Sequence, residues 1–173
     1  GIQVNQANND GWTPLNIACS NGHSNVCQNG HSKVVEMLLA VDGIQVNQAN
    51  NNGGTPLNIA CQEGHSKVVE KLLAVDDIQV NQADNNGTAP LCIACQQGHS
   101  KVVERLLAVA GIQVHKANGK GWTPLNVACH RGYSKVVKKL LTVDGIQVHQ
   151  VTNKGTTPLN SACFNGALTV VQM

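Results

Sequence analysis

The stretch that decides the fold is residues 43–76, GIQVNQANNNGGTPLNIACQEGHSKVVEKLLAVD, because the chain repeats it. Related copies begin at Asp77, Gly111 and Gly145, at a constant period of 34 residues, and an earlier copy begins at Gly1. A fixed period of about 20–50 residues is typical of repeat proteins, in which each copy forms one small structural unit. The sequence therefore predicts a stack of repeated units.

Each unit is predicted to hold a turn and two short helices. In the second copy, Thr55 and Pro56 predict a helix start, because threonine caps free amides and proline suits the first helical position. We expect Gly64 to end that helix and Ser66 to open a second one. The second helix carries an apolar stripe, made of Val68, Val69, Leu72 and Leu73. Because neither helix can bury its apolar side alone, neighbouring units should pack on each other.

Five units account for the 173 residues, and we number them one to five along the chain: 1–42, 43–76, 77–110, 111–144 and 145–173. They predict a single elongated domain with the architecture of an all-α repeat solenoid, in which extended, hairpin-like arms join the helix pairs. Asn-Gly pairs at 52–53 and 86–87 are tight-turn signals and are expected at the arm tips. The last unit stops partway through its second helix.

Unit three departs from the helix-start pattern. Its capping threonine has moved one place back, to Thr88, so that Ala89 precedes the proline. We expect this helix start to be weaker by about 1 kcal/mol, a typical value for a lost N-cap.

Unit one is eight residues longer than the next unit, and the extra residues can be located. The segment CSNGH at 19–23 is followed shortly by CQNGH at 27–31, as if the end of the first helix were written twice. Ending the helix at Gly30 would lengthen it by about 12 Å at 1.5 Å per residue. Ending it at Gly22 leaves a bulged loop, which costs little free energy. We therefore expect the helix to end near Gly22.

The duplication also places two cysteines and two histidines at regular spacing: Cys19, His23, Cys27 and His31. Two Cys and two His form a known zinc ligand set. Both cysteines, however, match a repeat position that we expect to be buried, and the spacing follows from duplicating one Cys-x3-His element. We therefore predict no metal site here, and no catalytic or cofactor-binding residues in the chain.

Four of the seven cysteines recur at the repeat period: Cys61, Cys95, Cys129 and Cys163. Packed helices lie about 8–10 Å apart, beyond the roughly 7 Å between Cα atoms that a disulfide can bridge. We expect these cysteines to be small buried residues with free thiols. Free thiols favour a reducing, intracellular compartment, the cytoplasm or the nucleus. No run of the sequence is long and apolar enough to suggest a membrane span.

The net charge of +2 conceals a difference between the two parts of the chain. Residues 1–110 carry five Lys and Arg against nine Asp and Glu, a balance of −4. Residues 111–173 carry seven against one, a balance of +6. The two ends should therefore attract different partners.

The tetrapeptide TPLN recurs at 13–16, 55–58, 123–126 and 157–160, with a following AC, then GHS and a VV–LL stripe. On these motifs, which extend over essentially the whole chain outside the insertion, the protein resembles the ankyrin-repeat family. The histidine that the family places after TPL is replaced here by asparagine or cysteine: Asn16, Asn58, Cys92, Asn126 and Asn160. Asparagine can both donate and accept hydrogen bonds between units.

The resemblance implies a right-handed stack in which arm tips and first helices line a concave face. Family members bind other proteins on this face and have no catalytic residues of their own. Carried over by position, the expected partner-binding residues are Trp12, Asn51, Asn52, Asn85, Asn86, Lys120, Trp122, His130, Arg131, Lys154 and Phe164.

Within this set, the sequence favours a site over units four and five. Trp and Arg are frequent at interface hot spots. Trp122 and Arg131 are the anchors expected close together, with Phe164 one unit further on and Lys154 beside it. We therefore predict that a protein partner presents an acidic, partly apolar segment. Trp122 could equally cover a neighbouring turn.

Three alternatives stay open. The basic units four and five could bind nucleic acid or another anionic surface, but aromatic platforms for bases are scarce there, so a solvated basic face is favoured. The chain could be the recognition arm of a larger enzyme. The terminal units lack polar outer faces, so they could also self-associate.

Overall fold

A computed structural model describes residues 3–21 and 28–172, and these residues form ten helices and no strand. The helices are α1 (Pro14–Ser20), α2 (Gln28–Leu39), α3 (Pro56–Glu63), α4 (Ser66–Leu73), α5 (Pro90–Gln97), α6 (Ser100–Leu107), α7 (Pro124–Arg131), α8 (Ser134–Leu141), α9 (Pro158–Phe164) and α10 (Leu168–Val171). Of these helices, none is both long and apolar enough to cross a membrane.

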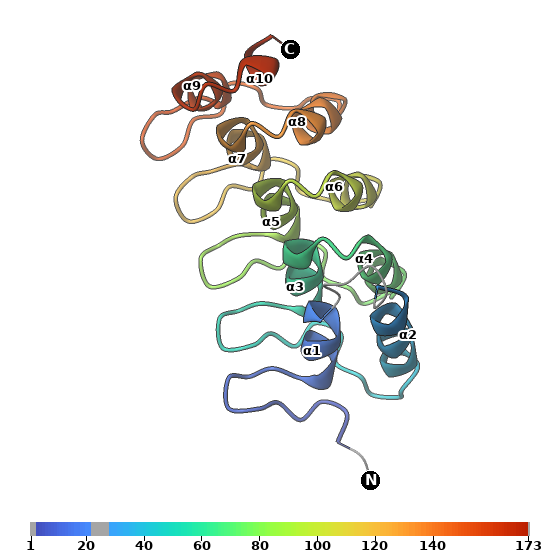
Figure 1. Ribbon diagram of the computed structural model, residues 1–173. Helices are drawn as coiled ribbons and strands as arrows, with labels where there is room; N and C mark the ends of the chain where they lie inside the picture. Colours follow the sequence, from blue (N-terminus) through green and yellow to red (C-terminus); the bar gives the residue numbers. More distant parts are fainter. Residues whose placement is uncertain (1–2, 22–27, 173) are drawn as a thin grey trace.

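The helices form two columns that run the length of the molecule (Figure 1). The odd-numbered helices stack in one column and the even-numbered helices in the other, and each odd helix also packs on the even helix that follows it. The arms that precede α3, α5, α7 and α9 project from the same side, and the two chain ends lie at opposite ends of the stack (Figure 1). The predicted all-α solenoid is confirmed.

The helix boundaries follow from the capping residues. The Thr55 hydroxyl accepts the backbone N–H of Asn58 at 3.2 Å, and Pro56 occupies the first position of α3. Gly64 ends the helix in the left-handed region at φ 76°, where a side chain would be strained. The predicted helix start at Thr55 and Pro56 and the predicted helix end at Gly64 are both confirmed. In unit three, Ala89 stands at the N-cap of α5 without a side-chain hydrogen bond, as the shifted threonine predicted.

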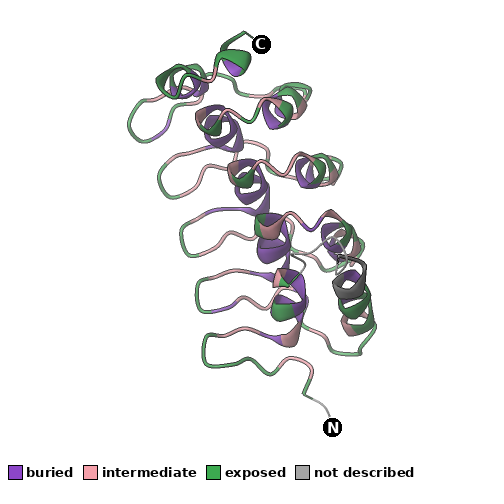
Figure 2. Cartoon of the chain, viewed as in Figure 1, coloured by how far each residue is buried: buried purple, intermediate pink, exposed green. Residues whose placement is uncertain are grey.

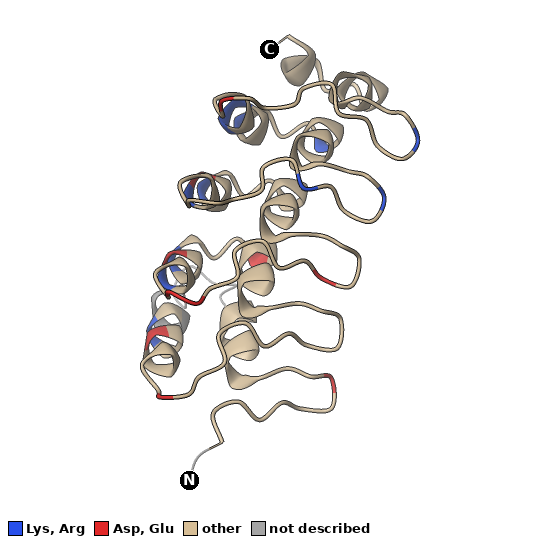
Figure 3. Ribbon diagram, turned by 180° about the vertical axis from the view of Figure 1, so that it is seen from behind, with Lys and Arg blue, Asp and Glu red and all other residues tan. Residues whose placement is uncertain are grey.

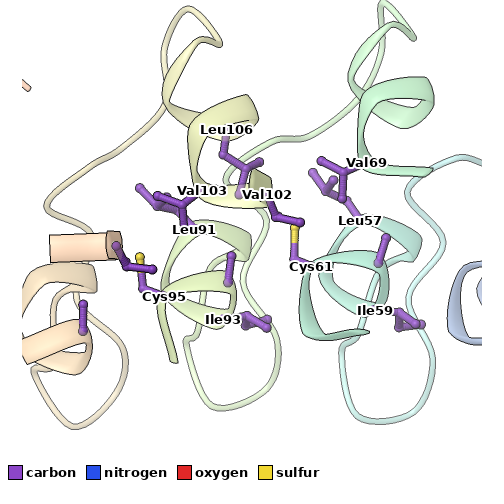
Figure 4. Packing of buried hydrophobic residues seen from close by; sticks show 14 of the residues in the cluster. Leu57, Ile59, Cys61, Val69, Leu91, Ile93, Cys95, Val102, Val103 and Leu106 are labelled. Atoms are coloured by element: carbon purple, nitrogen blue, oxygen red, sulfur yellow. The ribbon is translucent and has the colours of Figure 1, made fainter. Parts of the chain in front are cut away.

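The hydrophobic core lies between the two columns and is continuous along the stack (Figures 2 and 4). Leucines and valines from both columns are almost fully buried, among them Leu57, Val69, Leu91, Val103 and Leu106. Burying one such side chain stabilises the fold by about 1.5–3 kcal/mol. The arm tips, in contrast, are mostly exposed (Figure 2). The stack is therefore held by contacts between neighbouring helices.

The cysteines follow the prediction with one exception. Cys61 and Cys95 are fully buried and Cys129 is nearly so, and the cysteines that the structure describes are free thiols. Burial raises the pKa of the Cys129 thiol to about 11, so this thiol stays protonated at neutral pH. The prediction of burial was wrong for Cys163, which is exposed. It lies on α9, the last odd-numbered helix described, and no further unit covers it.

Asparagines at the position after TPL connect units one, two and four to the unit that follows. Nδ2 of Asn58 donates to the carbonyl of Thr88 at 3.4 Å. Nδ2 of Asn126 donates to the carbonyl of Gln150 at 3.2 Å, and Nδ2 of Asn16 donates to the carbonyl of Gln48 at 3.3 Å. Each of these side chains also accepts a hydrogen bond from the capping threonine of its own helix. The replacement of histidine by asparagine therefore preserves hydrogen bonding between units.

Unit one differs from its neighbours around the insertion. Helix α1 ends at Ser20, so the first helix does not continue to Gly30. Helix α2 begins at Gln28 and has 12 residues, whereas α4 has eight. The second helix is thus longer than the repeat pattern predicts. The bulged loop expected after Gly22 lies outside the described residues.

Both terminal units expose apolar side chains. In unit five, Leu159 is 55% exposed, whereas its equivalent Leu57 is 1% exposed under the next unit. Phe164 and Leu168 are 87% and 72% exposed. In unit one, Met37 is 65% exposed. The apolar side chains exposed in unit five agree with the expectation that this end of the stack lacks a polar outer face.

Candidate functional site

The arm tips form a continuous wall because hydrogen bonds join each tip to the one before it. The backbone N–H of Asn85 donates to the carbonyl of Asn52 at 3.1 Å, and Asn85 Nδ2 donates to the carbonyl of Asn51 at 3.0 Å. Asn51 makes the same two bonds to unit one, to the carbonyls of Asp10 and Asn9. The predicted contact residues Asn51 and Asn85 thus use their amide nitrogens inside this wall.

Each tip turn is closed by one side-chain oxygen. Asn50 Oδ1 accepts the backbone N–H groups two and four residues later, at 3.0 and 2.9 Å. Asp84 and Asn118 do the same in units three and four. Neighbouring tips also approach closely: a Cβ added to Gly53, whose φ is 77°, would lie 2.6 Å from the backbone nitrogen of Asn85. The residue that closes the tip turn can therefore be Asn or Asp, since either an amide or a carboxylate oxygen accepts these hydrogen bonds.

Four of the predicted contact residues line one cavity on the face shared by the arm tips and the ends of the odd-numbered helices, which we call the concave face. This cavity has a volume of about 240 Å³ and lies between the tip of unit four and the ends of α5 and α7. Its lining residues are Gln96, Asn118, Lys120, Trp122, Val127, His130 and Arg131, and we call it the unit-four cavity. The structure therefore brings Trp122 and Arg131 together.

His130 lines the unit-four cavity, and its ring contacts two other side chains. Its ring meets Trp122 edge-on, with 4.9 Å between ring centroids and 70° between ring planes. Its Nδ1 lies 2.7 Å from Nδ2 of Asn165, the residue that follows α9. Because an amide nitrogen only donates, Nδ1 of His130 accepts this hydrogen bond. The contacts of His130 therefore connect the Trp122 side chain to unit five.

One cation on each of α4, α6 and α8 is paired along the stack. Each pair joins one helix to a glutamate on the preceding even-numbered helix: Lys71–Glu36 at 2.8 Å, Arg105–Glu70 at 2.9 Å and Lys139–Glu104 at 2.7 Å. The side-chain hydrogen bond from Lys139 lowers the pKa of the Glu104 carboxyl. These charges stabilise the register between units and are satisfied within the chain.

Cations on the concave face are not paired in this way. Within the described residues, no ion pair involves Lys120, Arg131 or Lys154. All three side chains are exposed. Figure 3 shows basic residues both on the even-numbered helices and, separately, at arm tips and on the odd-numbered column. The concave cations are therefore available to a partner.

The remaining predicted residues lie apart from the unit-four cavity. Asn52 and Asn86 are exposed at their tips, and their backbone carbonyls accept hydrogen bonds from the next tip. Lys154 is exposed at the tip of unit five. Phe164 occupies the position equivalent to His130 and is almost fully exposed, but it does not line the cavity. Trp12 is partly buried against the core.

A second cavity lies on the same face, nearer the N-terminus. It has a volume of about 170 Å³ and is lined by Trp12, Asn50, Asn52, Gly54, Asn58, Ile59, Gln62, Glu63, Asp84 and Ile93, and we call it the unit-two cavity. The cavity contains two carboxylates and no lysine or arginine. Its charge is therefore opposite to that of the unit-four cavity.

Sequence reasoning missed two residues of the unit-four cavity: Asn118 and Val127. Gln96 belongs to the preceding unit, and its part in the cavity depends on the spacing between α5 and α7. Asn118 and Val127 occupy the repeat positions of Asn50 and Ile59 in unit two. The repeat identifies equivalent positions, but the sequence alone does not show that side chains of two units meet in one cavity.

No metal centre is formed by the described part of the chain, in which no three His, Cys, Asp or Glu side chains gather closely enough. Of the four residues considered as zinc ligands, Cys19 lies on α1 and is fully buried. The side chains of His23, Cys27 and His31 are not among those that the structure describes.

The stacked helix pairs define a helical repeat protein. The family model for ankyrin repeats in three copies matches residues 25–118 and again residues 103–173, and the chain belongs to the ankyrin-repeat family. Ankyrin repeats generally serve as protein–protein interaction modules and are typically not enzymes. The comparison with curated proteins returned no match.

Proposed function

We propose that this chain is a non-enzymatic interaction module that binds an acidic, partly apolar segment of another protein over units four and five. The observation that carries the proposal is the unit-four cavity, in which Trp122 and Arg131 lie beside Lys120. Arg and Trp are the residue types that most often dominate binding energy at protein interfaces.

The charge state of the cavity supports an acidic partner. Lys120 and Arg131 have no ion-pair partner within the described residues, so a carboxylate that reaches them replaces water and displaces no internal bond. Arg131 ends α7, where the partial negative charge of the helix dipole stabilises its cationic guanidinium group. The guanidinium can bind a carboxylate through two parallel hydrogen bonds, which adds geometric specificity.

The cavity also offers apolar surface. Trp122 is half-buried, and its ring is oriented by the edge contact with His130. Val127 reaches the cavity floor with 7% of its surface exposed. An apolar side chain of the partner could cover the accessible part of the Trp122 ring and remove it from water. A partner that alternates acidic and apolar residues fits both features.

Nucleic acid is the less favoured partner because the basic charge is divided between two surfaces. Lys120 and Arg131 line the unit-four cavity and Lys154 lies at the next tip, whereas Lys135 and Lys138 lie on α8 in the other column. A phosphate backbone follows one continuous basic surface. Unstacked bases also need aromatic platforms, and Trp122 is the aromatic residue of this cavity.

The proposal is tested with a fluorescein-labelled peptide that alternates Glu with Leu and Phe, titrated with the purified protein. Trp122→Ala and Arg131→Ala should each weaken binding by about 1–3 kcal/mol. Lys138→Ala is the charge control: it also removes an exposed cation, but from α8. Asn51→Ala and Asn85→Ala should barely affect binding, because those amides serve the wall of tips.

The measurement needs two comparisons. Thermal melts should show that each variant is folded, and a single-stranded oligonucleotide carrying the same label reports any affinity for phosphates. Equal loss from Lys138→Ala and Arg131→Ala would mean that general charge attraction explains the binding. Tighter binding of the oligonucleotide than of the peptide, with a steep salt dependence, would favour the nucleic-acid alternative.

A further inference from the structure

The two cavities of the concave face are the same site repeated two units apart. Six lining residues of the unit-two cavity have an equivalent 68 residues later in the unit-four cavity. The pairs are Asn50 and Asn118, Asn52 and Lys120, Gly54 and Trp122, Ile59 and Val127, Gln62 and His130, and Glu63 and Arg131. The floor is apolar in both cavities, since Ile59 and Val127 are each 7% exposed. Equivalent positions place the two cavities on one face.

The charge of these positions reverses along the stack. The last residue of the first helix is Glu63 in unit two, Gln97 in unit three and Arg131 in unit four. At the arm tips, Asp10 of unit one corresponds to Lys120 of unit four. Charged residues at the tips and helix ends are therefore acidic in units one to three (Asp10, Glu63 and Asp84) and basic in units four and five (Lys120, Arg131 and Lys154).

The even-numbered helices differ in part. In units two and three they carry both signs, and their acidic residues pair with cations of the following unit, as Glu70 does with Arg105 and Glu104 with Lys139. Helix α8 carries three lysines and no acidic residue. Part of the net-charge difference between the two parts of the chain is thus expressed on the concave face, as two regions of opposite sign. Figure 3 shows acidic residues in the lower part of the arm-side column and basic residues in the upper part.

We propose that the concave face binds one extended polypeptide segment with a basic end and an acidic end, held in a single orientation. The basic end lies at Glu63 and Asp84 in the unit-two cavity, and the acidic end lies at Lys120 and Arg131 in the unit-four cavity. This inference rests on the proposed function for the acidic end, and it adds the second cavity and the orientation.

The spacing of the two ends follows from the repeat. Packed helices lie about 8–10 Å apart, so two units separate the cavities by about 16–20 Å. An extended chain advances about 3.3 Å per residue, so about five or six residues connect the two charged ends. Apolar side chains between them would lie along the floor formed by Ile59, Ile93 and Val127.

Orientation follows from charge complementarity. At physiological ionic strength the Debye length is about 8 Å, which is shorter than the separation of the cavities, so each cavity acts on the nearby end of the partner. A segment bound in the opposite orientation would place like charges together in both cavities. Like-charge contact disfavours the wrong partner or orientation.

The acidic side chains can be neutralised with substitutions that the repeat itself already contains. Asp10→Asn matches Asn52, and Asp84→Asn retains the oxygen that closes the tip turn, as Asn50 does. Glu63→Gln matches Gln97 of unit three. The triple variant should therefore keep the fold. Its control is the triple variant Asp42→Asn, Asp76→Asn and Asp144→Asn, which removes the same charge from exposed residues after the even-numbered helices.

Two labelled peptides of identical composition serve as probes. In the bipolar peptide, a Lys cluster and a Glu cluster stand about six residues apart with Leu and Phe between them. In the mixed peptide, Lys and Glu alternate. The bipolar peptide should bind the unmodified protein about tenfold more tightly than the mixed one, and the acidic-face triple variant should lose this preference while the control keeps it.

The outcomes separate this inference from the proposed function. If the Glu-Leu-Phe peptide binds through Arg131 but the acidic-face triple variant retains full preference for the bipolar peptide, the proposed function stands and the bipolar inference is wrong. If the bipolar and mixed peptides bind equally well, the inference is also wrong. Rescue gives positive support: Glu63→Lys should weaken the bipolar peptide, and replacing the Lys cluster of that peptide with Glu should restore binding to this variant.

Discussion

At the scale of single residues, asparagine after TPL joins two units with one side chain. Asn58 Oδ1 accepts from Thr55, while Nδ2 donates to the carbonyl of Thr88 in the following arm. The sequence could predict that asparagine is able to do both, but not which carbonyl it would reach, because that partner lies 30 residues away. The same holds for Asn51, whose amide serves the wall of tips and not an open surface.

Asn58→Ala should therefore lower the free energy of unfolding by about 1–3 kcal/mol, because it leaves buried polar groups without a partner. Asn160→Ala is the matched control, since Asn160 occupies the same position on α9 but is exposed. Urea unfolding followed by circular dichroism measures both. An equal loss of stability in the two variants would show that the bond to the following unit contributes nothing.

At the scale of helices, the boundaries could be predicted because capping residues act locally. Thr55, Pro56 and Gly64 mark α3, and the structure begins and ends the helix at these signals. The start of α2 could not be predicted, because the duplicated segment offers two competing registers and packing against α1 and α4 selects between them. Exposure of Cys163 was missed for a related reason: burial at that position comes from the next unit and not from α9 itself.

The cap of α5 provides the prediction at this scale. Ala89→Thr should stabilise the protein by about 0.5–1 kcal/mol, because the new hydroxyl can accept a free amide at the helix start. Thr123 occupies the equivalent N-cap and is buried, so the position has room for threonine. Thr123→Ala should cause a loss of similar size. If Ala89→Thr leaves the unfolding midpoint unchanged, then Thr88 or the proline already satisfies that helix start.

At the scale of the whole molecule, the two ends of the stack differ from its middle. The helices of units two to four are covered on both sides, whereas Leu159 and Phe164 of unit five are largely exposed. The repeat pattern predicted this difference, because each unit buries its apolar surface against its neighbours. It could not predict the two cavities, since each combines side chains from more than one unit.

Hydrogen exchange should therefore be faster in units one and five than in units two to four, because opening an end breaks contacts with one neighbour only. The exposed apolar ends should also cause self-association, and Phe164→Glu with Leu168→Glu should reduce it. Mass spectrometry of exchanged peptides and sedimentation at several concentrations measure the two effects. Uniform protection along the chain would contradict faster exchange at the two ends. A sedimentation coefficient that does not change with concentration would contradict self-association.

The position of the partner can be read from the two tryptophans of the chain. Trp122 lines the unit-four cavity and Trp12 the unit-two cavity, so each indole N–H reports on one cavity. The most direct test is a titration of ¹⁵N-labelled protein with the Glu-Leu-Phe peptide, followed through the two indole signals, which Trp12→Phe assigns. We predict that the Trp122 signal shifts until the protein is saturated with peptide, while the Trp12 signal stays in place. A shift of Trp12 alone, or of neither signal under conditions where the peptide binds, would contradict it.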